Sequence, residues 1–394
     1  MDTTTMETLD SRLSAEERLM IEAVESLAAA RIEPRAAEID RTNAYPWDIK
    51  DLLAEQGVLM MPFPAKYGGV GASELAFAYA VEAVARVSMT SSLILAMQQL
   101  GALPILLGGS EEQKRRYLPP LASGEWLVAY GLTEPGAGSD ISAIRTRAER
   151  QGDHYVLTGG KQFITNAGLA HVNVIFAVTD PGRGANGGIS AFIVESDTPG
   201  FRVGKIEDTM GIRGSQNGEL LLDGCAAPLA NRIGQEGDGY QLALATFDRA
   251  RVGIGAQAVG VARGAFDYAV QYARQRVQFG KPIAEHEGIQ FLIADLATQI
   301  DAARLLVHQA AIRLDDHAPT AAVTRATAMA KLFASDVAMH VTTEAVQLLG
   351  GYGYTREYPV ERMMRDAKIT QIYEGTTQMQ RLTIARAILE TTAA

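Results

Sequence analysis

The hydrophobic pattern of this chain changes period twice, and this change constrains the fold more than any other feature. Apolar residues recur every three or four positions up to about residue 122, alternate with polar residues from Trp126 to about Gly234, and return to helical spacing from Tyr240 onward. A helical period predicts amphipathic helices, whereas alternation predicts half-buried strands. We therefore predict an α+β chain with an N-terminal helical domain (1–125), a middle antiparallel β domain (126–236) and a C-terminal four-helix bundle (237–394).

The first zone is expected to contain several helices. They cover 14–33, 46–56, 73–87 and 111–122, with breaks at 62–71 and 103–113. Ser110, followed by Glu111, Glu112 and Gln113, is a predicted helix N-cap with carboxylates in the first turn. The apolar run from Leu93 to Leu107 contains Gln98, Gln99 and Pro104, and we expect it to be too short and too interrupted to span a bilayer.

Two long apolar stripes define the last zone. Each steps by three or four positions, and their members are Ile289, Leu292, Leu296, Ile300, Ala303, Val307, Ala310 and Leu314, and then Val323, Ala326, Ala330, Phe333, Val337, Val341, Ala345 and Leu348. Such narrow faces predict long helices that pack lengthwise.

Composition narrows the class of protein. With 47% hydrophobic and 21% charged residues among 394, the chain is typical of a globular protein. A net charge of −10 argues against a general binder of nucleic acid or of an anionic membrane. The only cysteine, Cys225, excludes an intrachain disulfide and a multi-cysteine metal site, which favours a reducing cytoplasm and leaves no expected metal.

Two glycine-rich or aromatic segments are candidates for cofactor contact. The loop YGLTEPGAGSD (130–140) exposes backbone near two hydroxyls, although a plain connecting loop has the same composition. In KQFITNAG (161–168), Phe163 and Thr165 are expected on one strand face, where a ring and a hydroxyl can address a planar ligand; a core strand has the same pattern.

Three further segments carry charge. The segment 274–283 (RQRVQFGKPI) contains Arg274, Arg276 and Lys281, and a helix is expected to stop within it at Gly280 and Pro282. These positive charges suit the C-terminal end of the helix dipole, and they suit a pyrophosphate ligand equally well. FDRAR (247–251) is equally ambiguous.

Glu374 lies beside Gly375, before Thr376, Thr377 and Gln380, in an expected capping box that begins the last helix. A carboxylate held in such a break is expected to be partly desolvated, with a raised pKa that makes it a better base; a simple capping role is the alternative.

In their order and spacing these segments resemble the acyl-CoA dehydrogenase family, especially its short-chain (butyryl) branch. The motifs are YGLTEPGAGSD, KQFITNAG, RQRVQFGKPI, QLLGGYGY, YPVERMMRD and IYEGTTQMQR, and the resemblance covers nearly the whole chain. It implies the three-domain fold of that family, a noncovalent FAD between the β domain and the bundle, and a homotetramer in which a neighbouring subunit contacts part of each FAD.

The resemblance also assigns roles to individual residues. The expected FAD contacts within one subunit are Tyr130, Leu132, Thr133, Ser139, Phe163, Thr165, Thr376 and Gln378. Those expected at the subunit-related FAD are Arg276, Gln278, Phe279, Gln290, Gln347 and Gly351. The expected acyl-CoA contacts are Ser139, Asp248, Arg251, Tyr373 and Gly375. Many relatives carry Trp in place of Phe163, so the resemblance retains ring stacking there without an indole N–H.

The chemistry that the resemblance implies belongs to fatty acid β-oxidation. Glu374 would remove the α-proton of an acyl-CoA thioester, the β-hydrogen would leave as hydride to the flavin N5, and the product would be a trans-2-enoyl-CoA. The backbone N–H of Glu374 would help to stabilise the enolate-like oxygen. Electrons would pass to electron-transferring flavoprotein.

Several alternatives stay open at this point. An acyl-CoA oxidase would pass electrons to O₂, and an enoyl-CoA reductase would run the same reaction backwards, since direction depends on the potential of the acceptor. A non-catalytic acyl-CoA-binding protein would have lost the base or the flavin-facing residues. Decarboxylation of glutaryl-CoA is not favoured, because Thr90, Ser91 and Ser92 stand where decarboxylating relatives carry an arginine.

Overall fold

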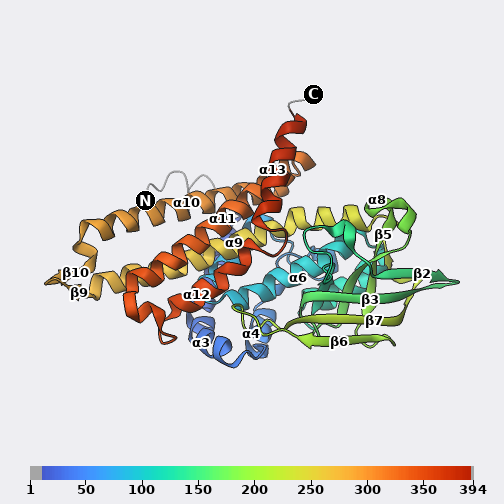
Figure 1. The fold of residues 1–394 in the computed structure, drawn as a ribbon, viewed down its shortest axis with the longest axis horizontal. Coiled ribbons are helices and arrows are strands. Elements are labelled where there is room, and N and C mark those ends of the chain that lie inside the picture. The colour runs from blue at the N-terminus through green and yellow to red at the C-terminus, as the bar shows by residue number, and fades with distance from the viewer. Residues whose placement is uncertain (1–10, 392–394) are drawn as a thin grey trace.

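The computed structural model describes residues 11–391 and confirms the order of helices, sheet and helical bundle (Figure 1). The N-terminal helices are α2 (Ala15–Leu27), α3 (Glu33–Thr42), α4 (Trp47–Glu55), α5 (Glu74–Ala85), α6 (Met89–Gly108) and α7 (Glu111–Ala122), with a π-helical turn at Ala28–Ile32 between α2 and α3. The predicted cap of α7 is confirmed, because the Ser110 hydroxyl accepts from the Gln113 N–H and the Gln113 side chain accepts from the Ser110 N–H.

Helix α6 differs from the expectation. It runs unbroken through Pro104 to Gly108, so the break predicted to begin at Leu103 is wrong. It is also long and apolar enough to cross a membrane, with a mean hydropathy of 1.5, but 83% of that window is buried inside the protein. The helix packs against α5, α7 and β1 and against the long helix α9 of the bundle. Packing on every side therefore accounts for an apolar helix that tolerates an internal proline.

The middle zone forms one sheet in the order β6-β7-β3-β2-β4-β5-β8, with β1 attached to β4. Its strands are β1 (Val128–Gly131), β2 (Arg147–Gln151), β3 (His154–Thr165), β4 (Val172–Val178), β5 (Ile189–Glu195), β6 (Phe201–Ile206), β7 (Asn217–Pro228) and β8 (Arg232–Ile233). Most neighbours are antiparallel as predicted, but β1 and β2 each pair with β4 in parallel. Parallel pairing needs a long connection, which the loops and strands between these partners supply.

The last zone is helical and elongated. Its helices are α9 (Gly239–Gln275), α10 (Glu287–Asp315), α11 (Thr320–Leu349), α12 (Pro359–Lys368) and α13 (Thr377–Thr391). The long helices α9, α10 and α11 lie lengthwise, α12 packs on α9 and α11, and α13 packs on α11 and projects from the bundle (Figure 1). Most members of the two predicted stripes are buried, whereas Phe333 is 38% exposed.

Helix α9 ends earlier than predicted. It stops at Gln275, and a small hairpin of β9 (Val277–Gln278) and β10 (Lys281–Pro282) follows. Phe279 and Gly280 both have positive φ, +53° and +81°, which is the conformation that a tight two-residue hairpin turn requires. Arg276 is therefore the C-cap residue of α9, whereas Lys281 lies on the hairpin and not in the helix.

Helices α5 and α9 join the first and last zones without a gap. A Cβ built on Gly264 would lie 2.0 Å from the Arg86 carbonyl oxygen, so the two helix backbones touch. The buried Glu82 of α5 contacts Arg263 of α9 and Arg304 of α10. One apolar core runs through both helical zones, while a second, smaller core lies within the β domain.

Candidate active site

The candidate base lies in a short loop between α12 and α13. A 3-10 turn (Ile369–Gln371) ends α12, and the chain then places Glu374 at φ +50° and Gly375 at φ +90° before α13 begins. A left-handed glutamate is unfavourable by about 1–3 kcal/mol and persists only where its surroundings hold it. The loop conformation is therefore imposed by its contacts.

Side chains on both sides hold this loop. Gln380 Nε2 donates to the carbonyl oxygens of Gly375 at 2.9 Å and Glu374 at 3.3 Å, and Lys331 Nζ donates to the Gly375 oxygen at 2.7 Å. The Thr376 hydroxyl caps α13 by accepting from the Met379 N–H at 3.3 Å. The predicted capping box is therefore wrong in part. A box needs a second side chain three residues after the cap, and Gln380 is four residues after Thr376.

The Glu374 carboxylate is desolvated, as predicted. Its Oε2 atom is buried and has no hydrogen-bond partner among the described residues. Burial raises the pKa of Glu374 to about 7, while the nearby positive charges of Lys331 and Arg251 act in the opposite direction. A carboxyl group with a pKa near neutrality is well matched to general-base catalysis.

Helix α9 brings a charged pair to the same place. Arg251 Nη1 lies 2.8 Å from Asp248 Oδ1, and the Thr324 hydroxyl of α11 donates to Asp248 Oδ2 at 2.6 Å. Arg251 is 7% exposed, and its buried Nε has no partner among the described residues. The pair therefore keeps one donor available beside Glu374.

Two tyrosines border the carboxylate from different elements. Tyr130 of β1 has a buried hydroxyl without a partner in the described chain, and its pKa is raised by burial and by the charge of Glu374. The Tyr373 hydroxyl donates to Gln257 Oε1 at 2.7 Å, and Gln257 Nε2 donates to the Ser92 hydroxyl at 2.9 Å. The loop, α9, α6 and β1 thus meet around Glu374.

A buried ion pair joins the two segments predicted to contact the cofactor, 130–140 and 161–168. Lys161 Nζ lies 2.7 Å from Glu134 Oε1 and donates to the Leu132 carbonyl at 3.2 Å. The Gln162 N–H donates to the Thr133 carbonyl at 2.9 Å. The loop after β1 and the end of β3 therefore form one rigid face.

Phe163 lies on that face with an unusual backbone. Its φ is +58°, and the β3–β7 pairing shifts register between Lys161 and Ile164. This bulge leaves the Phe163 ring 63% exposed while Ile164 is buried. Thr165 follows on the less buried side and accepts from Asn217 Nδ2 at 3.3 Å. Phe163 and Thr165 are both more exposed than the buried Ile164 between them, which agrees with the expected alternation, and a register shift lies beside them.

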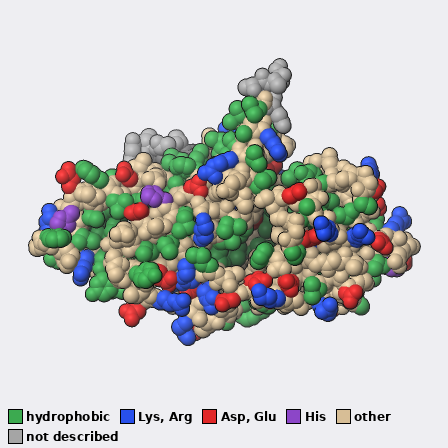
Figure 2. Space-filling view, in the orientation of Figure 1, with side chains coloured by type: hydrophobic (Ala, Val, Ile, Leu, Met, Phe, Trp, Pro, Cys, Tyr) green, Lys and Arg blue, Asp and Glu red, His purple; other side chains and the backbone are tan. Residues whose placement is uncertain are grey.

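These residues fit a flavin. A bare aromatic ring is available at Phe163, a Cβ built on Gly136 or Gly138 would meet no atom within 4 Å, and Ser139 and Gln378 are exposed. Tyr130, Arg251 and Glu374 each have a buried polar atom without a partner among the described residues, and the charge of Glu374 acts on the other two. Figure 2 shows the surface hollowed between the helical and β halves, below α13, with hydrophobic side chains in the hollow.

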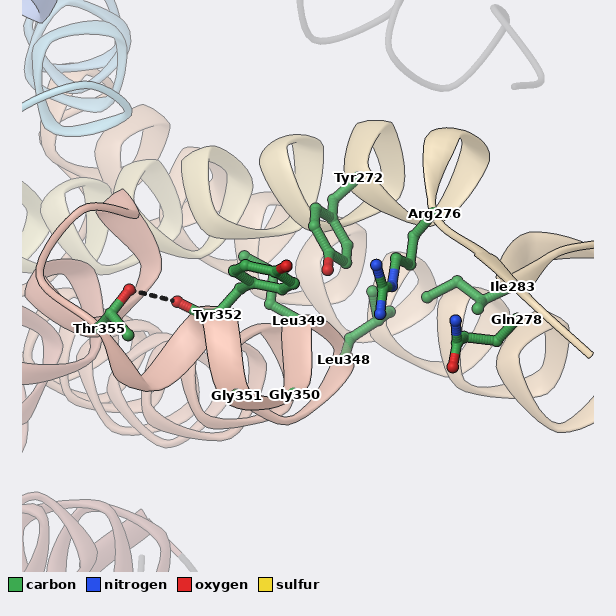
Figure 3. A pocket seen from close by; sticks show the side chains of 10 residues that line it. All are labelled: Tyr272, Arg276, Gln278, Ile283, Leu348, Leu349, Gly350, Gly351, Tyr352 and Thr355. Atoms are coloured by element: carbon green, nitrogen blue, oxygen red, sulfur yellow. Dashed lines mark hydrogen bonds between the residues drawn. The ribbon is translucent and has the colours of Figure 1, made fainter.

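The remaining expected cofactor residues lie elsewhere, at the far end of the bundle. A pocket of about 590 Å³ is lined there by Arg276, Gln278, Gly351 and Tyr352, among others (Figure 3). The Arg276 guanidinium lies 5.5 Å from the centre of the Tyr352 ring. Phe279 is 95% exposed, Gln347 is exposed, and Gln290 donates to the Ala284 carbonyl. Lys331 at the Glu374 loop and Leu348 at this pocket are seventeen residues apart on α11, or about 26 Å at the helical rise.

Some residues of the site were not found from the sequence. Lys331 and Gln257 were not singled out, and the Glu134–Lys161 pair was quoted in motifs without a role. One signal was available for Lys331, which interrupts a face of small residues on α11 that includes Thr327, Ala334, Ser335 and Ala338. A lysine on such a face predicts either a solvated edge or a buried charge, and only the packing of α13 and α9 distinguishes the two.

Comparisons with known proteins agree with this geometry. Family models for the acyl-CoA dehydrogenase N-terminal, middle and C-terminal domains match residues 14–125, 129–225 and 237–389. The short-chain-specific acyl-CoA dehydrogenase of Clostridium acetobutylicum is 47% identical over 381 residues, which cover 96% of this chain and 100% of that protein.

Two solved structures are also close. Butyryl-CoA dehydrogenase from Megasphaera elsdenii superimposes with a TM-score of 0.92 at 43% identity, over 96% of this chain and 99% of the other. A chain in the structure of the electron-transferring flavoprotein of Acidaminococcus fermentans, studied for flavin-based electron bifurcation, has a TM-score of 0.93 at 46% identity, over 96% and 98% of the two chains.

Proposed function

The chain belongs to the acyl-CoA dehydrogenase family, and from that premise we propose that Glu374 is the general base that removes the α-proton of an acyl-CoA thioester. Members are FAD-dependent oxidoreductases that dehydrogenate acyl-CoA. When bound, FAD supplies the two-electron acceptor that takes up the β-hydrogen, so that a trans-2-enoyl-CoA results. The single observation that carries the proposal is the buried Glu374 Oε2 atom, which has no hydrogen-bond partner among residues 11–391.

The protein also has to stabilise the charge that develops on the thioester oxygen, because the α-proton of a thioester is only weakly acidic. We assign the backbone N–H of Glu374 as one donor. This N–H lies in the left-handed turn and donates to no acceptor within residues 11–391. Donors that are oriented before the reaction are worth several kcal/mol in such sites.

We propose the following binding roles for the other residues. Tyr130, Leu132, Thr133, Ser139, Phe163, Thr165, Thr376 and Gln378 form the flavin face. Ser139, Asp248, Arg251, Tyr373 and Gly375 contact the acyl-CoA. The rigid Glu134–Lys161 connection and the exposed Phe163 ring support the first group, and the Arg251–Asp248 pair beside Glu374 supports the second.

Arg276, Gln278, Phe279, Gln290, Gln347 and Gly351 are proposed to contact the FAD of a neighbouring subunit. The separation of about 26 Å along α11 supports this, because the pocket at the end of the bundle is remote from Glu374 in the same chain. In an assembly that brings the pocket of one copy to the flavin face of another, both groups of residues can contact the same FAD. We propose that this assembly is a homotetramer. Within each subunit we retain the domain limits 1–125, 126–236 and 237–394.

The hydroxyls expected near the acyl end are already committed inside the protein. Thr90 donates to the Arg213 carbonyl at 2.9 Å, Ser91 donates to the Ser88 hydroxyl at 2.9 Å, and Ser92 accepts from Gln257. None of these carries the positive charge that would bind a terminal carboxylate. We therefore propose simple dehydrogenation without decarboxylation.

Substitution of the base tests the proposal most directly. We expect Glu374→Gln to retain FAD but to lose about 10²–10⁴-fold in the rate of flavin reduction by acyl-CoA, because a well-placed base contributes that much. The matched control is Glu357→Gln, which alters an exposed carboxylate in the preceding loop. A panel of straight, branched and dicarboxylic acyl-CoAs with a dye acceptor supplies the rates. Near-normal turnover of Glu374→Gln would refute the assignment.

For the electron acceptor we propose electron-transferring flavoprotein, and for the location a reducing cytoplasm, which suits the single buried Cys225. The acceptor is tested by comparing reoxidation of the reduced enzyme by O₂ with reoxidation by a flavoprotein acceptor. Faster reoxidation by O₂ would favour the oxidase alternative. A purified protein that is colourless, or whose flavin is not bleached by any acyl-CoA, would favour a non-catalytic binding protein.

A further inference from the structure

Lys331 is a buried cation in the middle of α11. Its residue is 0% exposed, and it lies on a helix face with Thr327, Ala334, Ser335 and Ala338, each of which is also fully buried. Burial lowers the pKa of Lys331 to about 7, with Glu374 acting to raise it. A lysine is almost never fully buried unless it has a partner, because a desolvated ammonium group is costly.

The partner of Lys331 is the loop that carries the base. Its Nζ donates to the Gly375 carbonyl oxygen at 2.7 Å, directly after Glu374 in the chain. It forms no ion pair with the Glu374 carboxylate among the described residues, but its charge still acts on that group. Lys331 thus reaches the base by two routes, a hydrogen bond to its loop and an electrostatic field at its side chain.

The same helix holds the loop at its two ends. Ser335 donates to the Thr370 carbonyl at 2.9 Å. Asp336 accepts from Gln371 at 2.7 Å and from Arg381 at 3.0 Å. These contacts fasten the start of the loop and the first turns of α13 to α11. Lys331 is the α11 contact nearest to Glu374, and it is the one that adds a buried charge.

The other groups that face Glu374 are already engaged or uncharged. Arg251 of α9 pairs with Asp248 at 2.8 Å, Tyr130 of β1 is neutral because its pKa is raised, and Tyr373 of the loop donates to Gln257. Asp336, which attracts Lys331, is bound to Gln371 and Arg381. The positive charge of Lys331 is therefore the one near Glu374 that no direct carboxylate partner offsets.

We propose that Lys331 is a positioning residue for the base: it holds the left-handed Glu374–Gly375 turn against α11 and favours the ionised form of the Glu374 carboxylate. The inference rests on the proposed function, in which Glu374 accepts the α-proton. Without Lys331, the carboxylate would keep its burial but lose the stronger of two opposing charges. It would then hold its proton at a higher pH and sit in a looser turn.

The experiment compares three variants as FAD-loaded enzymes. Lys331→Met removes the charge and the donor at similar length, and Lys331→Gln removes the charge but keeps an N–H donor. Ser335→Ala is the matched control, because it deletes a hydroxyl of the same helix that contacts the Thr370 carbonyl of the loop at 2.9 Å and the Lys331 carbonyl at 2.5 Å, without changing a charge. For each protein, the pH dependence of kcat/KM is measured, and the protonation of Glu374 is followed by its carboxylic C=O band in infrared difference spectra. Glu374→Gln identifies that band.

We expect the acidic limb of kcat/KM and the infrared midpoint to move upward by about one pH unit in both Lys331 variants, since a nearby opposite charge typically shifts a carboxyl pKa by about that much or more. The plateau of kcat should fall further in Lys331→Met than in Lys331→Gln, and Ser335→Ala should leave the midpoint in place. If Lys331→Met fails to bind FAD, the titration midpoint of Glu374 in Lys331→Gln tests the inference by itself.

Unchanged midpoints in both Lys331 variants would overturn the inference, even if kcat fell, because a merely structural contact would lower kcat without moving the titration of Glu374. An equal shift in Ser335→Ala would overturn it too. Failure of the proposed function is a separate result: if Glu374→Gln turns over normally, Glu374 is not the base, whatever the Lys331 variants do.

Discussion

Two glutamates with buried carboxylate oxygens border the proposed flavin site, and their surroundings are opposite. Glu134, after β1, pairs with Lys161 at 2.7 Å and accepts the N–H groups of Arg145 and Thr146 at 2.7 and 3.0 Å. Burial opposes its ionisation, but these partners outweigh burial and lower the pKa of Glu134. Glu374 keeps one buried oxygen that has no partner within the described part of the chain, and its pKa rises to about 7.

The difference separates a structural carboxylate from a reactive one. Every oxygen of Glu134 is used to hold the loop after β1 against β3, so this glutamate cannot exchange a proton without breaking the flavin face. Glu374 is held through its backbone by Lys331 and Gln380, which leaves its side chain available. Perturbed carboxyl groups in a cleft are typical of functional sites, whereas saturated ion pairs are typical of rigid scaffolds.

The largest expected effect on stability is at the saturated pair. Lys161→Met should lower the free energy of unfolding by about 3–5 kcal/mol, because Glu134 would remain buried without its counter-ion. Urea unfolding at pH 7, monitored by circular dichroism, measures the change. Glu374→Gln is the comparison and should be neutral or stabilising, since it removes an unpartnered carboxylate. A loss as large in Glu374→Gln as in Lys161→Met would erase the distinction between the two glutamates.

The pH dependence of stability should show the second effect. The folded pKa of Glu374 is about 7 against an ordinary value of 4.5, so the folded protein binds more protons than the unfolded chain within that window. Its contribution to stability is therefore present at low pH and falls as pH rises, by at most about 3 kcal/mol. In urea unfolding of the apoprotein, the free energy of unfolding of Glu374→Gln should increase relative to that of the unsubstituted protein between about pH 5 and pH 7. A constant difference across this range would contradict the raised pKa.

A third effect appears in catalysis. Because the base must be ionised, kcat/KM should rise about tenfold per pH unit up to a limb near the Glu374 pKa of about 7, and then level off. Steady-state rates with a saturating dye acceptor give the profile. Because kcat/KM reports the free enzyme, a limb near the ordinary carboxyl value of 4.5 would contradict a raised pKa of Glu374 before substrate binds.

The smallest expected effect is at the exposed ring. Phe163→Leu should weaken FAD binding by about 0.5–1.5 kcal/mol, the contribution of one aromatic contact, while the stability of the apoprotein changes little because Phe163 is 63% exposed. Fluorescence titration of the apoprotein with FAD measures the affinity. Phe163→Trp is the control, since it keeps a stacking surface and should bind at least as well. Equal affinity for the Leu and Trp variants would show that the ring does not stack.

The period of the hydrophobic pattern was enough to predict the three zones, because a buried helix face and a buried strand face require different spacings. It failed at α6, where residues on all faces are buried and packing overrides the proline. It also failed at the end of α9, where the helix stops at Gln275 and the chain turns through the two left-handed residues Phe279 and Gly280. At Phe163 the alternation of exposed and buried residues agreed with the pattern, but the positive φ and the register shift there were not predicted.

What the sequence alone determined is the order of the zones, the segments that resemble the acyl-CoA dehydrogenase family and the identity of the candidate base. Those features depend on neighbours along the chain. Only the tertiary structure decided that Glu374 has a buried oxygen without a partner, that Lys331 reaches the Gly375 carbonyl, and that the pocket around Arg276 is remote from both. Desolvation and charge act through space, and the residues that supply them here come from α9, α11, β1 and the loop before α13.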